Sequence, residues 1–446
     1  MKFFVKIYKL YLIVVAAFVV INVFSIFDAK FNAELLRYII IYGLALILTQ
    51  LPISRNCFTK YIISFYYVFL GIIQPIDIMN RVEAYTDSIR TSPALVLNQT
   101  LRLHYLDNLI ISFVTIIAVV YFFYHSNKSF QFMLPSNIYT FRIHVNPIVL
   151  GIIYGVIKYI IQSKYKILVA GSSPIIPHSG IIVYSIRILN ILLFGLSLDA
   201  IISSKMDVRK QFKTIFFLFI IYALPQTLLG TRSEIITWLT MTVFVIVNNY
   251  KFKDIKILFK YILPVAVLLG AALIVASYVR FSERIDIFAF LTGRFTGMVD
   301  GINIVKYLDD GGHWFPIKNF FYEMIGVEGG IRIASFYTHT IMGYPSHLLH
   351  SWAMPGFCAG LLYMGMFGNI FISIFVGYIF LKAENMIKSS KGIFDNCAGA
   401  YLYVASFFAF MEGSVDTLAN NILVVIVVKL IIILSGLKFS IKKEKI

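Results

Sequence analysis

The chain has 446 residues, of which 59% are hydrophobic and only 14% are charged, and its mean hydropathy is +0.83. A soluble domain carries about 25% charged residues, so a chain this apolar would fail to cover a water-facing surface. The net charge of +17 does not indicate nucleic-acid binding, because most of the excess lies in short segments between apolar stretches, where lysine and arginine anchor membrane topology. Composition therefore excludes a soluble domain and favours one helical bundle in a bilayer.

About twelve apolar stretches approach the length of about 20 residues that a membrane-spanning helix needs. The first follows a lysine-bearing start without a small-residue cleavage motif, so we expect it to be retained as a span. The seventh and eighth are joined by a tight turn at Gly230–Thr231–Arg232. The predicted spans cover 10–27, 35–53, 61–79, 109–124, 147–162, 180–203, 214–229, 233–249, 261–279, 356–381, 397–411 and 418–437.

Lysine and arginine are concentrated in alternate connections, such as 205–213 and 251–260. Cytoplasmic connections carry this excess in membrane proteins. The pattern therefore predicts a multi-pass protein with both termini in the cytoplasm. We expect residues 1–446 to form a single transmembrane domain, an all-α polytopic bundle.

Three segments fall on the opposite side: 80–108, 163–179 and the long segment 280–346 between the ninth and tenth spans. We refer to 280–346 as the long loop. Its aromatic residues, including Trp314, Phe320 and Phe336, favour stretches that fold back onto the membrane surface as amphipathic or re-entrant helices. The chain has no internal repeat of the kind that many transporters show.

Arginines near the predicted outer surface are candidates for binding an anion. Arg232 stands at the start of a span, where backbone N–H groups and the positive end of the helix dipole favour a lipid phosphate. Arg280 and Arg284 share a face if the ninth span continues, and Arg294 follows them. Such a cluster suits a pyrophosphate. The alternatives are an interfacial snorkelling role for Arg232, a membrane anchor for Arg280, and pairing of Arg284 with a neighbouring carboxylate.

Residues for proton transfer lie further along the long loop. His339 and His350 are candidate general bases for a sugar hydroxyl, because a histidine pKa lies near working pH. Asp300, Glu323 and Glu328 are rival bases. No metal motif accompanies the histidines, and the three cysteines are too far apart in the sequence for a metal spacing.

Four cations fall inside or near predicted spans, where charge is costly and therefore indicates function. Lys158 and Arg187, on consecutive spans, would face a polar cavity that admits a glycan or a lipid phosphate. The alternative is snorkelling, or pairing with a carboxylate such as Asp199. The other two cations are Arg37 and Lys429.

The arginine motifs occur in a fixed order. They are Gly230–Thr231–Arg232–Ser233 before a span, Tyr278–Val279–Arg280–Phe281 after the next, and Phe290–Leu291–Thr292–Gly293–Arg294–Phe295 in the long loop. This order resembles the bacterial oligosaccharide repeat-unit polymerases, the O-antigen polymerase family. The segment from Pro345–Ser346–His347 to Gly365–Met366–Phe367–Gly368 is also similar to that family. The resemblance covers mainly residues 220–385. The positions that match the family's motifs are Arg232, Arg280 and Arg294, and we refer to them as the carried-over arginines.

The resemblance implies an inner-membrane glycosyltransferase of the C-type helical architecture with a large periplasmic loop. Such enzymes move a glycan from undecaprenyl pyrophosphate to the end sugar of a second lipid-linked unit, building O-antigen or a similar surface polysaccharide. The resemblance implies no metal or nucleotide cofactor. Its expected partners are undecaprenyl-pyrophosphate-linked glycans and membrane lipids, with a chain-length regulator left open. Fixed arginines would stabilise the charge that develops on the departing pyrophosphate.

Two alternatives stay open. A ligase that moves a finished glycan onto a lipid core shares the span count, the large external loop and the basic residues. A flippase or transporter of lipid-linked oligosaccharides would have short loops on both sides, with its charge concentrated within the spans.

Overall fold

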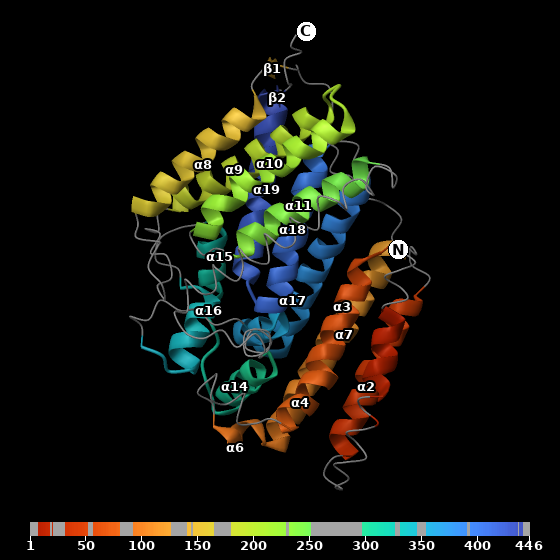
Figure 1. Ribbon diagram of the computed structural model, residues 1–446. Helices are drawn as coiled ribbons and strands as arrows, with labels where there is room; N and C mark the ends of the chain where they lie inside the picture. Colours follow the sequence, from red (N-terminus) through yellow and green to blue (C-terminus); the bar gives the residue numbers. More distant parts are fainter. Residues whose placement is uncertain are drawn as a thin grey trace.

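The computed structural model describes residues 8–17, 20, 32–51, 57–80, 92–125, 141–143, 146–164, 180–228, 232–250, 297–325, 331–345, 354–389, 393–435 and 437–439. These residues form a bundle of helices with one short two-stranded ladder (Figure 1). Six described helices are long and apolar enough to cross a membrane. They fall on the second, third, fourth, sixth, tenth and twelfth predicted spans. The prediction of a bundle of membrane-spanning helices is therefore confirmed. The count of twelve stays a prediction, since the ninth predicted span, 261–279, lies outside the described residues.

The first half of the chain begins with a short apolar helix at Tyr8–Ala17. It continues with α2 (Asn32–Gln50), α3 (Thr59–Val68), η2 (Phe69–Ile73), α4 (Gln74–Asn80), α6 (Pro93–Val96), α7 (Gln99–His125), β1 (Phe141–Ile143), α8 (Pro147–Lys164), α9 (Gly180–Ile202), α10 (Val208–Leu228) and α11 (Arg232–Asn249).

The second half contains α14 (Gly297–Asp309), α15 (Ile317–Ile325), α16 (Ile333–Phe336), η3 (Tyr337–Ile341), α17 (Gly356–Ser389), α18 (Ile393–Glu412), α19 (Val415–Ser435) and β2 (Leu437–Phe439). Helices α14, α15 and α16 and the π-helical turn η3 all belong to the long loop. The loop is therefore helical over much of its described part.

The bundle has two distinct ends (Figure 1). The loop end carries α14, in the lower part of the figure, and α16, at its left. The strand end, at the top, carries the parallel pair β1 and β2, in which Arg142 lies opposite Lys438. Apolar side chains from nearly every helix form one continuous core between the two ends.

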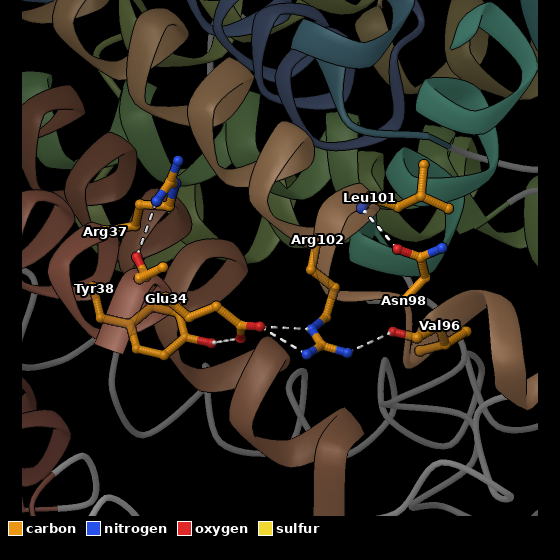
Figure 2. Close-up of polar contacts among 8 residues, drawn as sticks. Glu34, Arg37, Tyr38, Val96, Asn98, Leu101 and Arg102 are labelled. Atoms are coloured by element: carbon orange, nitrogen blue, oxygen red, sulfur yellow. Dashed lines mark hydrogen bonds and ion pairs between the residues drawn. The ribbon is translucent and has the colours of Figure 1, made fainter. Parts of the chain in front are cut away.

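Helix α7 begins earlier than the sequence predicts. The fourth span was expected over 109–124, with the preceding residues in an external segment, whereas the helix starts at Gln99. Charged residues in its first turns find partners on α2: Arg102 Nη2 lies 2.7 Å from Glu34 Oε1, and Arg37 Nε lies 2.7 Å from Asp107 Oδ1. Figure 2 shows the Glu34 carboxylate between Arg102 and the Tyr38 hydroxyl. The pairing compensates charges that would be costly to bury singly, so α7 carries them into the bundle.

Helix α17 is broken after two turns. Met364 and Gly365 leave the helical conformation, and Gly365 has a φ of 59°, which favours glycine. The chain bends so sharply that the Gly360 and Gly368 backbones meet: a Cβ added to Gly360 would lie 2.6 Å from the Gly368 carbonyl oxygen. The first two turns of α17 therefore fold against its third turn.

We expect Gly360→Ala to destabilise the protein by about 1–3 kcal/mol, because the new methyl group overlaps main-chain atoms that have no other rotamer to adopt. Gly43→Ala in α2 is the matched control, since a Cβ there meets nothing within 4 Å. Alanine at that site should be neutral or stabilising by up to about 1 kcal/mol. Unfolding midpoints in detergent measure both changes. Equal midpoints for the two variants would contradict the close backbone packing at Gly360.

Candidate functional site

Five of the candidate site residues, Arg280, Arg284, Arg294, Glu328 and His350, lie outside the described residues. Arg232 is described in its backbone only, where it is the first residue of α11. The prediction that this arginine begins a helix is confirmed. Its proposed contact with a phosphate stays a prediction.

Arg232 and Arg187 lie toward the same end of the bundle. Helix α9 starts near α15, where the Tyr184 hydroxyl donates to the carbonyl of Met324. The far end of α9 meets the far end of α11, because Gln211 Nε2 donates to the Ile202 carbonyl at 3.3 Å and Tyr250 donates to Gln211 at 2.9 Å. Both helices therefore begin at the loop end.

Asp300 lies in the first turn of α14, where an acidic side chain is favoured by the helix dipole. Its side chain is buried, and it accepts a hydrogen bond from the Tyr337 hydroxyl at 2.6 Å. Burial, followed by the Asp300 charge and the hydrogen bond to Asp300, raises the pKa of Tyr337 well above its ordinary value. Tyr337 is thus a hydrogen-bond donor at neutral pH. The contact joins α14 to η3 and favours an anchoring role for Asp300; its role as a base stays a prediction.

His339 lies on η3, a π-helical turn of the kind often found at functional sites. Its Nδ1 lies 3.0 Å from the carbonyl oxygen of Tyr344. A carbonyl only accepts, so Nδ1 carries the ring hydrogen when the imidazole is neutral, and Nε2 holds the basic lone pair. His339 is half-buried. This arrangement suits a general base, which is the predicted role.

Arg187 is the centre of a polar cluster inside the bundle. Its Nη1 donates to Asn420 Oδ1 and, at 3.4 Å, to Asn421 Oδ1, both on α19. Asn421 also accepts from the Tyr401 hydroxyl of α18 at 2.8 Å. The guanidinium therefore points into the bundle and binds amides, and it does not pair with Asp199 as the alternative interpretation had it.

Carboxylates complete the cluster at the loop end. Glu323 of α15 lies 3.3 Å from Arg332 Nε, and its backbone carbonyl accepts from Asn420 Nδ2 at 3.3 Å. Asp416, in the first turn of α19, is buried and lies close enough to Arg332 and Arg187 for their charges to act on it. We call the group of Arg187, Glu323, Arg332, Asp416, Asn420 and Asn421 the Arg187 cluster.

Tyr363 lies beside this cluster, immediately before the break in α17. Its ring packs against Phe315 and Phe320, with centroid distances of 5.3 and 5.8 Å. Its hydroxyl is buried near the carboxylates of Asp416 and Glu323, and it has no hydrogen-bond partner among the described residues. A buried hydroxyl without a partner costs about 1–3 kcal/mol, so a hydrogen bond from a polar group of a ligand would be favourable there.

The other cations within spans have structural partners. Arg37 pairs with Asp107, and Lys429 lies 2.8 Å from Asp395. The pairing interpretation therefore holds for these two. The side chain of Lys158 lies outside the described residues. Arg187 is thus set apart from Arg37 and Lys429, because its guanidinium donates to two amides instead of pairing with one carboxylate.

The Arg187 cluster offers chemistry suited to a polar substrate at a membrane surface. Arg332 is half-exposed, with 51% of its side chain accessible, whereas Glu323 is 18% exposed, so the cluster runs from the surface into the bundle. Guanidinium groups bind phosphate oxygens, and amides and carboxylates bind sugar hydroxyls. In the described part of the chain, no three histidine, cysteine or acidic side chains gather closely enough to hold a metal ion.

Sequence reasoning singled out Arg187 and Glu323 but missed Asp416, Asn420 and Asn421. These three residues open an otherwise apolar helix at spacings that place Asp416 and Asn420 on one face. Polar residues at such spacing in a span are the signal that would have found them. Tyr363 carries no comparable signal in the sequence, because its hydroxyl lies beside the cluster only as a result of the tertiary fold around the break in α17.

Comparisons with protein-family models, with curated proteins and with solved structures find no match for this chain.

Proposed function

We propose that the protein is a glycosyltransferase that polymerises undecaprenyl-pyrophosphate-linked repeat units into O-antigen or a similar surface polysaccharide. It would act at the periplasmic face of a bacterial inner membrane, without a metal. The single observation that carries the proposal is the Arg187 cluster. Two guanidinium groups, two carboxylates and two amides gather at the loop end of an apolar bundle.

The chemistry requires a fixed positive charge beside the leaving group and a base for the acceptor proton. The bond between the anomeric carbon and the pyrophosphate breaks, and the pyrophosphate leaves with the electron pair. The acceptor hydroxyl forms the new glycosidic bond and gives its proton to a base. Arginines held by hydrogen bonds, as Arg187 is, stabilise the developing charge without reorganising.

The described residues divide these roles between them. Arg187 and Arg332 would bind the phosphates. The carried-over Arg232, Arg280 and Arg294 would share that role, as the resemblance implies. Among the predicted bases, His339 has the more suitable arrangement, because Nε2 holds the lone pair and the ring is half-buried. Asp300 is turned to Tyr337 inside the loop end. Holding two membrane-tethered substrates side by side supplies much of the remaining rate enhancement.

Deleting the gene in its host and restoring it on a plasmid tests the proposal. The deletion should leave single repeat units attached to the lipid core, and the plasmid should restore long polymer. Gel profiles of the surface glycan measure both results. A bare core in the deletion strain would overturn the proposal, since it is the outcome for a ligase or for a transporter of the lipid-linked unit.

A further inference from the structure

Helix α15 exposes an apolar face that the bundle leaves uncovered. Ile317, Phe321 and Ile325 recur every fourth residue, which places them on one side of the helix. They are 51%, 48% and 56% exposed. A face of this kind on a helix outside the predicted spans is costly in water and indicates an interaction surface.

The opposite side of α15 is bound to the bundle. Asn319 is buried, Glu323 pairs with Arg332, and the Met324 carbonyl accepts from Tyr184. The Glu323 carbonyl accepts from Asn420, and α15 packs along α19. The orientation of the helix is therefore set, and its apolar face points away from the core.

The contacts also give the depth of α15 along the bundle. Tyr184 lies in the second turn of α9, and Asn420 lies in the second turn of α19. Because α15 contacts both, it lies beside the first two turns of two helices that are long and apolar enough to cross a membrane. Outward-facing side chains further along these two helices, such as Leu189 and Ile426, are exposed and apolar as well.

We propose that the exposed face of α15 lies in the headgroup and upper acyl region of the bilayer, with a lipid surface as its partner. Two neighbouring residues fit this position. Trp314 is 62% exposed just before the helix, and tryptophan is enriched at membrane interfaces. Lys318 is exposed on α15 beside the apolar face, where an ammonium group meets lipid phosphates.

One consequence rests on the proposed function. Helix α15 carries lipid-facing residues on one side and Glu323 of the Arg187 cluster on the other. A pyrophosphate whose lipid tail remains in the bilayer would therefore reach the cluster by passing the side of one nine-residue helix. The lipid contact itself does not depend on this function.

The three tryptophans, Trp238, Trp314 and Trp352, allow a direct test by fluorescence. The full chain with Trp238→Phe and Trp352→Phe keeps Trp314 alone, in nanodiscs made with phospholipids brominated at a shallow or a deep acyl position. We expect a several-fold loss of emission, greater for the shallow bromines, and weak quenching by aqueous iodide. The matched control keeps Trp238 alone, which is buried in the bundle and should respond little to either quencher.

Strong iodide quenching without bromolipid quenching would overturn the proposal. A second measurement avoids the tryptophan substitutions, in case they impair folding: a photo-crosslinking amino acid replaces Phe321 in the otherwise unchanged chain. Adducts with phospholipid support the lipid contact, whereas adducts with a second copy of the chain or with another protein overturn it. Neither measurement involves polymer synthesis, so failure of the proposed function would leave the result intact.

Discussion

Alanine in place of Arg187 is expected to lower polymer synthesis by about 100- to 1,000-fold, the usual effect of removing one preorganised donor from a developing negative charge. The guanidinium is held by Asn420 and Asn421 and acts on Asp416, so its removal also leaves that carboxylate less compensated. The length profile of the surface glycan, in a deletion strain carrying the variant, measures the effect. Immunoblots of the membrane fraction check that the variant is inserted.

Two further variants separate catalysis from packing. Arg187→Lys keeps the charge but loses the planar fork, so partial activity is expected. Arg37→Ala is the matched control, because Arg37 is also an arginine within a span, but its guanidinium pairs with Asp107 of α7, which is not part of the Arg187 cluster. That variant should still make long polymer when inserted. Full-length polymer from Arg187→Ala would remove the cluster from the mechanism.

The carried-over arginines give an independent comparison. Alanine at Arg232 or Arg294 should leave the protein inserted and abolish the long product, as the resemblance implies. If those variants fail but Arg187→Ala does not, the arginines of the resemblance carry the phosphate and the Arg187 cluster is structural. If long polymer is lost in all three variants, the Arg187 cluster and the carried-over arginines belong to one site.

Apolar length was enough to predict most of the described spans, because hydrophobic stretches separated by charged connections report directly on the cost of burying charge in lipid. Where the prediction failed, as at the start of α7, the cause was an interaction between distant residues. Glu34 and Arg102 are 68 positions apart, and either one alone marks only the limit of an apolar stretch. The break in α17 was equally hidden, since Gly365 stands within a long apolar run.

The candidate site was likewise predicted only in part from the sequence. A charge within an apolar stretch drew attention to Arg187 and to Glu323 of the long loop, but not to their neighbours. The cluster brings together α9, α15, α19 and the segment before α16, and no spacing within the chain encodes that meeting. The proposed anion-binding role of Arg280 and Arg294 rests on the resemblance, and that of Arg284 rests on its spacing from Arg280.

Removing the arginine of the buried ion pair is expected to cause the greatest loss of stability. Arg102→Met should lower the free energy of unfolding by about 3–5 kcal/mol, because it leaves the Glu34 carboxylate buried without its counter-charge. Both side chains are nearly inaccessible, at 9% and 1% exposure, and Arg102 also donates to the Val96 carbonyl at 3.2 Å (Figure 2). Thermal unfolding in detergent, followed by size-exclusion chromatography, measures the change.

The two ion pairs between α2 and α7 supply their own control. Asp107→Asn breaks the pair with Arg37, but Asp107 is 47% exposed, so water replaces the lost contact and the cost should be about 0–1 kcal/mol. Combining Glu34→Gln with Arg102→Met removes the stranded charge and should recover most of the loss from Arg102→Met alone. If the double variant is as unstable as Arg102→Met, packing of the arginine stem, and not the uncompensated carboxylate, is what holds the start of α7 in place.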